Sequence, residues 1–393
     1  MKVATGLAIG NKPAPELAAL AVESAMQKAG ITSPACVLLF LTSEFASNPQ
    51  LAIKAAAKAA SCTNIIGCSA MGIFTQEDWV IDSPAVAAMV FSKPLFVHAN
   101  LVKPNLEKTG LEKPSLENSI FKDAGLVHLD ENDNLLLTLT APNAVDTRWL
   151  NPLQLFDNPQ RFGGVSGDAI GHGPFTIWQN AKGNSLGYCE FALNNISSAV
   201  GVSHGLKIIS NPRKITACDA YDLTHLANKS ALDSLKLAYF KQLDCLEDLP
   251  YHQLMAVYAS KGASIERGNF SVTSLVNGND ANGSVTLAKT MQIGDYLSWA
   301  LRDVDAAQVD IVKTATKLKA QLKSAPQFAL LFSNLGRGPY FYNGLDQDLN
   351  LLKTLFPKLP IIGFYGNGGI APINGQNELL QYSAVLGLFS EKT

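Results

Sequence analysis

Charge is scarce in this chain, and so are the patterns that mark several large classes of protein. Only 16% of its 393 residues are charged, and the formal net charge is -2 with no run rich in Lys or Arg. A nucleic-acid partner would require a basic face, so the composition argues against one. Hydrophobic residues make up 47% of the chain, which allows a large core and argues against disorder.

Cysteine pairs and long apolar runs are missing as well. The six cysteines are scattered without a CxxC pair, which is typical of reduced thiols rather than of a disulfide framework. No window reaches the roughly 18 apolar residues of a membrane helix, and Asn11 and Pro13 interrupt the start too early for a signal peptide. We therefore expect a cytoplasmic protein with no membrane partner. No cluster of His, Cys and carboxylates predicts a metal site, and no motif predicts a cofactor.

Two stretches at opposite ends of the chain share one order of predicted elements. Each has an apolar strand, a polar or glycine-rich turn, a helix, a second strand with Ile-Ile-Gly, a small-residue loop and a closing strand. The first copy reads ACVLLFLTSE, NIIGCSAMGIF and SPAVAAMVFS between residues 35 and 92. The second reads QFALLFSNLGRG, PIIGFYGNGGI and YSAVLGLFS between residues 327 and 390. This internal repeat predicts two halves of one architecture, with a small-molecule ligand where their loops converge.

The residues between these two copies follow a different sequence pattern. Short apolar segments with tight connections between residues 134 and 209 are typical of antiparallel strands, and apolar residues at helical spacing predict one or two helices over 295–323. We expect a mixed α/β (α+β) fold of two related parts, each with a mixed or antiparallel sheet covered by helices. The predicted boundary divides the chain into residues 1–215 and 216–393.

Five segments, in this order along the chain, resemble the FIST family of two-part sensory domains. They are Ile65 to Ser69, Arg161 to Gly164 with Gly167-Asp168, His204-Gly205, Gly336 to Gly338, and Ile361 to Pro372. The resemblance extends over nearly the whole length, and no single motif carries it alone. It implies an N-terminal and a C-terminal FIST part that form one small-ligand sensor in intracellular signal transduction, with a separate signalling protein as its partner. Amino acids are the ligand class usually proposed for the family.

The sequence departs from the family pattern at three positions. Ile73 and Gly369 stand where acidic residues are typical, and Asn334 stands where cysteine is common. The two missing carboxylates would be the natural counter-charges for a ligand ammonium group. Their loss favours a neutral or anionic ligand, such as a small carboxylate, over an amino acid.

The candidate ligand-binding residues come from the turns of both copies and from the glycine-rich central segment. They are Gly67, Cys68, Ser69, Arg161, Gly163, Gly164, Asp168, His204, Gly336, Arg337, Gly338, Tyr365, Gly366 and Asn367. Arg337 is the principal candidate, because flanking glycines permit close approach and its guanidinium suits a carboxylate. In that role, replacing Arg337 with alanine should weaken ligand binding and leave the fold intact.

Structural alternatives stay open for these residues. Arg337 could close a turn on backbone carbonyls, Asp168 could cap a turn, and Tyr365 could pack on the neighbouring sheet. A different class of function would use Cys68 as the nucleophile of an acyl-transfer or amide-hydrolysing enzyme. That function requires an accessible thiol beside a base, and no histidine lies near Cys68 in the sequence. We therefore favour recognition without catalysis, and we expect Cys68 to be neither accessible nor hydrogen-bonded to a base.

Overall fold

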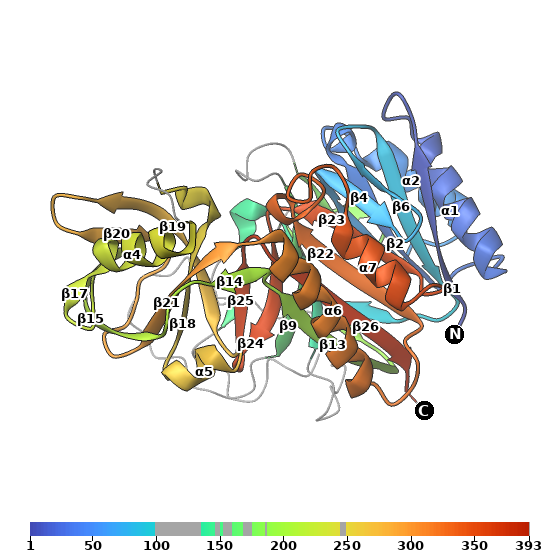
Figure 1. Cartoon of the computed structure of the whole chain (residues 1–393). Helices are drawn as coiled ribbons and strands as arrows, with labels where there is room; N and C mark the ends of the chain where they lie inside the picture. Colours follow the sequence, from blue (N-terminus) through green and yellow to red (C-terminus); the bar gives the residue numbers. More distant parts are fainter. Residues whose placement is uncertain are drawn as a thin grey trace, which may run out of the picture.

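The computed structural model describes residues 1–98, 135–145, 150–151, 159–167, 175–184, 187–243 and 249–392, and the statements below concern these residues. They form a body of three β-sheets with helices on its outside and a smaller β-barrel beside it (Figure 1). The barrel lies at the left of the view, and both chain ends lie on the opposite flank of the body. The expected mixed fold of strands and helices is confirmed.

The three sheets of the body have the same strand order. From one edge to the other, neighbouring strands pair antiparallel, antiparallel, parallel, antiparallel and antiparallel. The first sheet consists of β1 (Val3–Ile9), β6 (Ala85–Phe91), β2 (Cys36–Thr42), β3 (Ile65–Ala70), β10 (Ile177–Gln179) and β11 (Lys182–Gly183). The second consists of β7 (Phe96–His98), β12 (Tyr188–Leu193), β8 (Leu135–Thr140), β9 (Gln160–Val165), β24 (Gly368–Ile373) and β25 (Gln376–Leu380). The third consists of β13 (Ile196–Ser203), β26 (Ala384–Glu391), β22 (Phe328–Asn334), β23 (Ile361–Gly366), β4 (Gly72–Thr75) and β5 (Trp79–Ile81).

The parallel pair at the centre of each sheet shows that the body contains three repeats. Gly67, Gly163 and Gly363 lie at the same position of β3, β9 and β23, each opposite a residue of the parallel neighbour. A Cβ atom on any of them would lie 1.7 or 1.8 Å from the carbonyl oxygen of that opposite residue. Both terminal copies contain the predicted strand, helix, second strand and closing strand, but the small-residue loop expected after each Ile-Ile-Gly strand is a β-hairpin, β4–β5 or β24–β25. The chain between them, predicted to be antiparallel strands, is a third copy with its own parallel pair, β8 and β9.

Each repeat completes the sheet of a neighbouring repeat with a β-hairpin. The hairpin β4–β5 of the first repeat pairs with β23 of the third. The hairpin β10–β11 of the second repeat pairs with β3 of the first, and β24–β25 of the third pairs with β9 of the second. The three repeats are therefore interlocked in a cycle, and none has a complete sheet without the others.

Phenylalanine rings fill the centre of the body where the three sheets face one another. The Phe364 ring centre lies 5.1 Å from those of Phe40 and Phe332, and the Phe162 ring centre lies 5.2 Å from that of Phe332. The residue that follows the shared glycine differs in size among the repeats: it is Cys68, Gly164 or Phe364. A Cβ atom on Gly164 would lie 2.4 Å from the Phe364 ring, so the small residue makes room for the large one.

Helices cover the outer faces of the first and third sheets. These helices are α1 (Glu16–Ala29), α2 (Gln50–Ala60), α6 (Val304–Gln321) and α7 (Gln347–Leu355). In each repeat, a short 3₁₀ turn follows the first parallel strand: η1 (Ser43–Phe45), η2 (Pro142–Ala144) or η4 (Leu335–Arg337). The alanine-rich α1 ends at Gly30, whose left-handed backbone suits a helix C-terminus. Asp303 and Asp346 cap α6 and α7 by accepting backbone N–H groups. Buried apolar residues of these helices pack on the sheets.

The β-barrel is inserted into the third repeat, between β13 and α6. Its elements are β14 (Leu206–Ile208), β15 (Arg213–Asp219), β16 (Asp222–Leu226), β17 (Lys229–Ser230), α4 (Ala231–Leu243), η3 (Tyr251–Gln253), β18 (Leu254–Ala259), α5 (Gly262–Glu266), β19 (Ser271–Asn279), β20 (Ser284–Leu287) and β21 (Tyr296–Arg302). All pairings are antiparallel, and β18 pairs with both β19 and β21, which closes the sheet. The boundary predicted between residues 215 and 216 falls inside β15.

The helical prediction over 295–323 is half wrong. Its second part is α6, but its first part is β21. Leu297, Trp299 and Leu301 alternate along that strand and enter the apolar core of the barrel. A period of two was therefore present in the sequence before the helical period began.

We expect Gly163→Ala to destabilise the protein by at least about 3 kcal/mol, because the added methyl group overlaps the Thr138 carbonyl oxygen in a packed sheet. Urea unfolding followed by circular dichroism measures the effect. Gly183→Ala is the matched control, since a Cβ atom there meets nothing closer than 3.6 Å. Equal stability of the two variants would contradict the close approach on which the threefold repeat rests.

Candidate functional site

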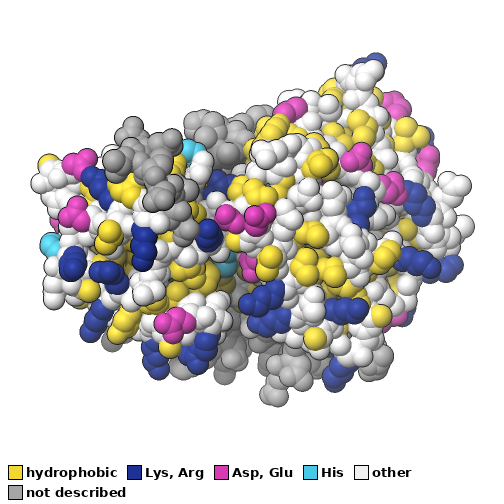
Figure 2. All heavy atoms as spheres, in the orientation of Figure 1, with side chains coloured by type: hydrophobic (Ala, Val, Ile, Leu, Met, Phe, Trp, Pro, Cys, Tyr) yellow, Lys and Arg dark blue, Asp and Glu magenta, His cyan; other side chains and the backbone are white. Residues whose placement is uncertain are grey.

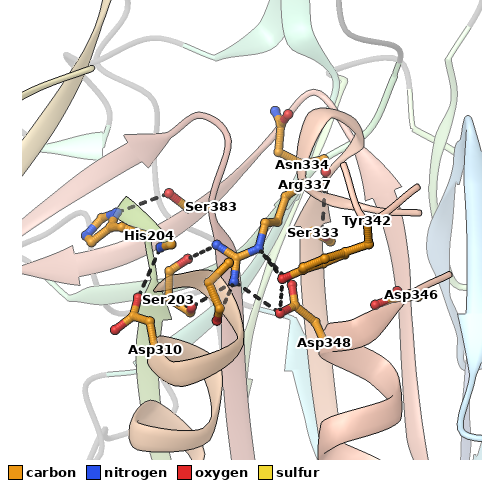
Figure 3. Close-up of polar contacts among 12 residues, drawn as sticks. Ser203, His204, Asp310, Ser333, Asn334, Arg337, Tyr342, Asp346, Asp348 and Ser383 are labelled. Atoms are coloured by element: carbon orange, nitrogen blue, oxygen red, sulfur yellow. Dashed lines mark hydrogen bonds and ion pairs between the residues drawn. The ribbon is translucent and has the colours of Figure 1, made fainter. Parts of the chain in front are cut away.

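Arg337 is held inside the body and not in an open turn. The residue is only 1% exposed. Nε and Nη2 donate to the two carboxylate oxygens of Asp348 at 2.9 and 3.1 Å, and Nε also lies 3.1 Å from the Tyr342 hydroxyl (Figure 3). Nη2 further donates to the Ser203 hydroxyl at 2.9 Å and to the Ala307 carbonyl at 3.3 Å. The guanidinium therefore joins η4 to β13, α6 and α7.

The ends of secondary-structure elements position these partners. Ser203 is the last residue of β13, and Asp348 lies in the first turn of α7, where the helix dipole favours a carboxylate. Burial alone would lower the pKa of Arg337, but Asp348 and Tyr342 outweigh burial and raise it above its ordinary value. The arginine is thus a charged member of a closed buried network.

The role predicted for Arg337 is therefore corrected. Asp348 occupies the place expected for a ligand carboxylate, and Gly205 leaves the space that the guanidinium fills. A Cβ atom on Gly205 would lie 2.2 Å from Nη1 of Arg337. The flanking residues Gly336 and Gly338 do permit close approach, as predicted, but aromatic rings of the same chain use that space.

Tyr365, expected in a glycine-rich loop but found in the strand β23, is one of these rings. A Cβ atom on Gly338 would lie 2.7 Å from the Tyr365 ring, which is fully buried. The Tyr365 hydroxyl donates to Asp346, the residue that caps α7. Burial and the nearby Asp348 carboxylate raise the pKa of Asp346 to about 6. The structure therefore matches the alternative in which Tyr365 packs inside the protein.

The remaining central glycines lie within a sheet and not around a hollow. Gly163 and Gly164 pair with Ile370 and Gly369 of β24. Between β23 and β24, the backbone N–H of Asn367 donates to the Val165 carbonyl at 2.9 Å. The Val165 carbonyl also leaves no room for a side chain at Gly366, since a Cβ atom there would lie 2.2 Å from it.

Arg161 lies near the start of β9 and has its own buried partner. Its Nε donates to Glu190 of β12 at 2.7 Å, and both side chains are 3% exposed. Arg161 is therefore the cation of a separate buried ion pair. Asp168, a further candidate, lies outside the described residues.

Gly67, Cys68 and Ser69 are buried strand residues of β3. Burial raises the pKa of the Cys68 thiol well above its ordinary value, and this fully buried thiol forms no hydrogen bond with a described residue. The Ser69 hydroxyl accepts the backbone N–H of Thr176 at 2.9 Å. The expectation that Cys68 is inaccessible and not bonded to a base is confirmed, and a protonated, buried thiol is a poor nucleophile.

His204 lies where the body meets the barrel. Its Nδ1 atom is 3.1 Å from the Ser383 hydroxyl (Figure 3). Its ring centre is 5.6 Å from that of Phe270, the residue before β19. Burial and the positive charge of Arg337 lower the pKa of His204 to about 4, against the opposing effect of Asp310. His204 is thus a predicted residue that lies at the junction of the two parts.

Sequence reasoning missed Arg302, the last residue of β21. Its guanidinium carbon lies 4.2 Å from the ring centre of Tyr382 and 5.1 Å from that of Phe341. It donates to the backbone carbonyls of Gly336 and His252. No carboxylate of the described residues forms an ion pair with Arg302, and burial lowers its pKa. No local sequence motif identifies Arg302, which is the last residue of an ordinary strand.

The junction of body and barrel is polar and furrowed. Side chains of both charges and a histidine lie along the boundary between the two parts on the face shown in Figure 2. Lys289 of the barrel and Glu378 of β25 form an ion pair of 3.1 Å across the junction, and the Ser271 hydroxyl also donates to Glu378. A groove between the parts is lined by Tyr258, Ala259, Ser260, Ser264, Asn269, Ser271, Asp295 and Asn374.

Comparisons with known proteins match most of the chain. The FIST N domain matches residues 35–229, and the FIST C domain matches residues 231–372. The uncharacterized protein Rv0628c of Mycobacterium tuberculosis is 24% identical over 98% of this chain and 99% of its own length. The uncharacterized protein Mb0898c of Mycobacterium bovis is 26% identical over 58% of this chain and 59% of its own length.

The two family models together match more than half of the chain. The chain belongs to the FIST family, whose domains are sensory, ligand-binding domains of signal transduction. The predicted membership is confirmed. Within the described residues, no helix is long and apolar enough to cross a membrane.

We expect Arg337→Ala to lower the free energy of unfolding by about 3–5 kcal/mol, because it leaves the Asp348 carboxylate buried without its partner. The double variant with Asp348→Ala should lose less than the sum of the two single losses. Urea unfolding of the four proteins in this cycle measures the coupling. An Arg337→Ala variant as stable as the parent would restore the ligand role predicted from the sequence.

We expect His204 to make stability depend on pH. Its pKa in the folded protein is about 4, below the ordinary 6.5, so the unfolded chain binds the proton first as pH falls. The contribution of His204 is therefore present above about pH 6.5 and lost as pH falls toward about 4, by about 3 kcal/mol at most. His204→Gln should remove this loss, whereas His225→Gln, at an exposed site on β16, should not. Parallel pH dependence of His204→Gln and the parent in urea unfolding would contradict the assignment.

Proposed function

We propose that this protein senses a small molecule that carries a carboxylate or a similar anionic group. The molecule binds at the junction of body and barrel, and the protein does not catalyse a reaction on it. The observation that supports the proposal is Arg302, a partly buried guanidinium with no ionic partner among the described residues. A separate signalling protein would read the bound state.

The surroundings of Arg302 are suited to a bound anion. A desolvated cation without a counter-charge is costly, and an anionic ligand would offset that cost. The rings of Tyr382 and Phe341 hold the guanidinium in place, so little side-chain freedom would be lost on binding. Tyr382 has a φ of 53°, in the left-handed region that bulky residues avoid. Such backbone strain is concentrated at functional sites in proteins generally.

The contacts of Arg302 also supply a route from the ligand to the surface helices. Arg302 donates to the carbonyl of Gly336, and the next residue, Arg337, donates to Asp348 in the first turn of α7. On its other side, Arg302 directly precedes Asp303, the residue that caps α6. A ligand that shifts Arg302 would therefore act on the starts of both helices that cover the third sheet. This route is part of the proposal, and coupling measurements are its test.

We expect Arg302→Gln to weaken the binding of a small carboxylate by about tenfold to a hundredfold, the range for losing a charge-assisted hydrogen bond of about 1.5–3 kcal/mol. Isothermal titration calorimetry with a panel of acetate, succinate and benzoate measures the affinity, and thermal unfolding confirms that the variant is folded. Arg267→Gln is the matched control, since Arg267 is exposed at the end of α5.

Two results would refute the site. The first is a panel member that binds the parent and Arg302→Gln with equal affinity. The second is an equal loss of affinity in Arg302→Gln and Arg267→Gln, which would indicate a general effect of net charge and not a site at the junction.

A further inference from the structure

A second concave surface lies on the flank of the body far from the barrel, at the seam between the first and third repeats. It is lined by the start of β1, the end of α1, the end of α6 and the segments that lead into β22 and β23. The residues are Met1, Lys2, Val3, Lys28, Ala29, Lys319, Ala325, Pro326, Gln327, Phe356, Pro357, Lys358, Leu359 and Pro360. We call this surface the lysine groove. The right-hand flank of the body, where α1 and α7 lie in Figure 1, also carries a gathering of basic side chains in Figure 2.

The lysine groove has a charge that the rest of the chain does not share. Four of its lining residues are lysines and none is acidic, although the whole chain has a net charge of -2. Lys28 pairs with Glu77 outside the groove, and the other three form no ion pair with a described residue. Lys2 donates to the Gly30 carbonyl, and the Lys319 ammonium lies 5.8 Å from the Phe356 ring centre. The groove is therefore a positive site within an acidic protein.

The base of the groove is apolar and rigid. Phe356, Leu359 and three prolines supply apolar surface, and prolines have little backbone freedom to lose when a partner binds. One buried polar atom in this setting lacks a hydrogen bond: the side-chain oxygen Oε1 of Gln327. A buried acceptor of this kind gains when an incoming group supplies an N–H donor.

We propose that the lysine groove docks an acidic, extended segment of a partner protein that also carries an apolar side chain. The lysines would meet carboxylates, Phe356 and the prolines would meet the apolar side chain, and a backbone N–H of the segment would reach Gln327. The groove is open along the seam and does not enclose a ligand on all sides, so an extended chain fits it better than a small metabolite. The site is independent of Arg302, and it supplies a place for a signalling partner.

The test is fluorescence anisotropy of the full chain with a short fluorescein-labelled peptide of alternating glutamate and phenylalanine. A peptide with lysine in place of glutamate is the charge control, and vesicles of anionic lipid are a competing surface. We expect the acidic peptide alone to bind, with affinity that falls as salt rises from about 0.05 to about 0.5 M. The double variant Lys319→Glu, Lys358→Glu should weaken this binding by at least about tenfold.

Two further variants separate the groove from a general effect of charge. Lys313→Glu with Lys317→Glu reverses two exposed charges of α6 outside the groove and should leave the affinity unchanged. Phe356→Ser keeps every charge and should also weaken binding. The proposal is overturned if the acidic peptide does not bind, if both lysine pairs have equal effects, or if Phe356→Ser has none. Loss of vesicle binding in Lys319→Glu, Lys358→Glu without loss of peptide binding would assign the groove to a lipid surface instead.

Discussion

Each repeat of the body lacks the last two strands of its own sheet and receives them from a neighbour, and this exchange holds the three repeats in one unit. The borrowed hairpin of each sheet pairs beside the strand that carries Gly67, Gly163 or Gly363. Unpaired strand edges leave backbone groups without hydrogen bonds. Removing one repeat would leave one hairpin unpaired and a second sheet incomplete, so the body is expected to unfold as a whole. The rigid centre of phenylalanine rings follows from the same closure.

The closed body explains why the Arg337 loop holds an ion pair and not a ligand. Strand ends and helix starts converge on η4, and the charged arginine that the loop buries there requires a nearby carboxylate. Asp348 in α7 supplies it, while Ser203 and Ala307 fill the remaining donor positions. Arg302 lies where the chain passes from barrel to body, and no carboxylate of the described residues forms an ion pair with it. Of these two arginines, the one in the glycine-rich turn is therefore paired with a carboxylate, and the one at the junction has no ionic partner among the described residues.

Local signals in the sequence were sufficient for the two terminal repeats and insufficient for the rest. Ile-Ile-Gly between apolar strands identifies β3 and β23, because both faces of those strands are buried. The second repeat escaped detection because Arg161 stands where the others have isoleucine, and the Glu190 that neutralises it is distant in sequence. Arg337 could not be assigned correctly for the same reason: Ser203 and Asp348 meet it only in the folded chain. The barrel strand β21 was hidden by the helical period of α6 that follows it.

The three repeats differ most where function is expected. The 3₁₀ turn after the first parallel strand ends in Phe45, Ala144 or Arg337. Phe45 joins the apolar cluster under α1 and α2, whereas Arg337 organises a buried polar network. The third repeat is also the one that contains the barrel, and its network extends to His204 and Arg302 at the junction. The third repeat, which the barrel interrupts, therefore carries a buried polar network at a position where the first repeat carries part of the apolar core.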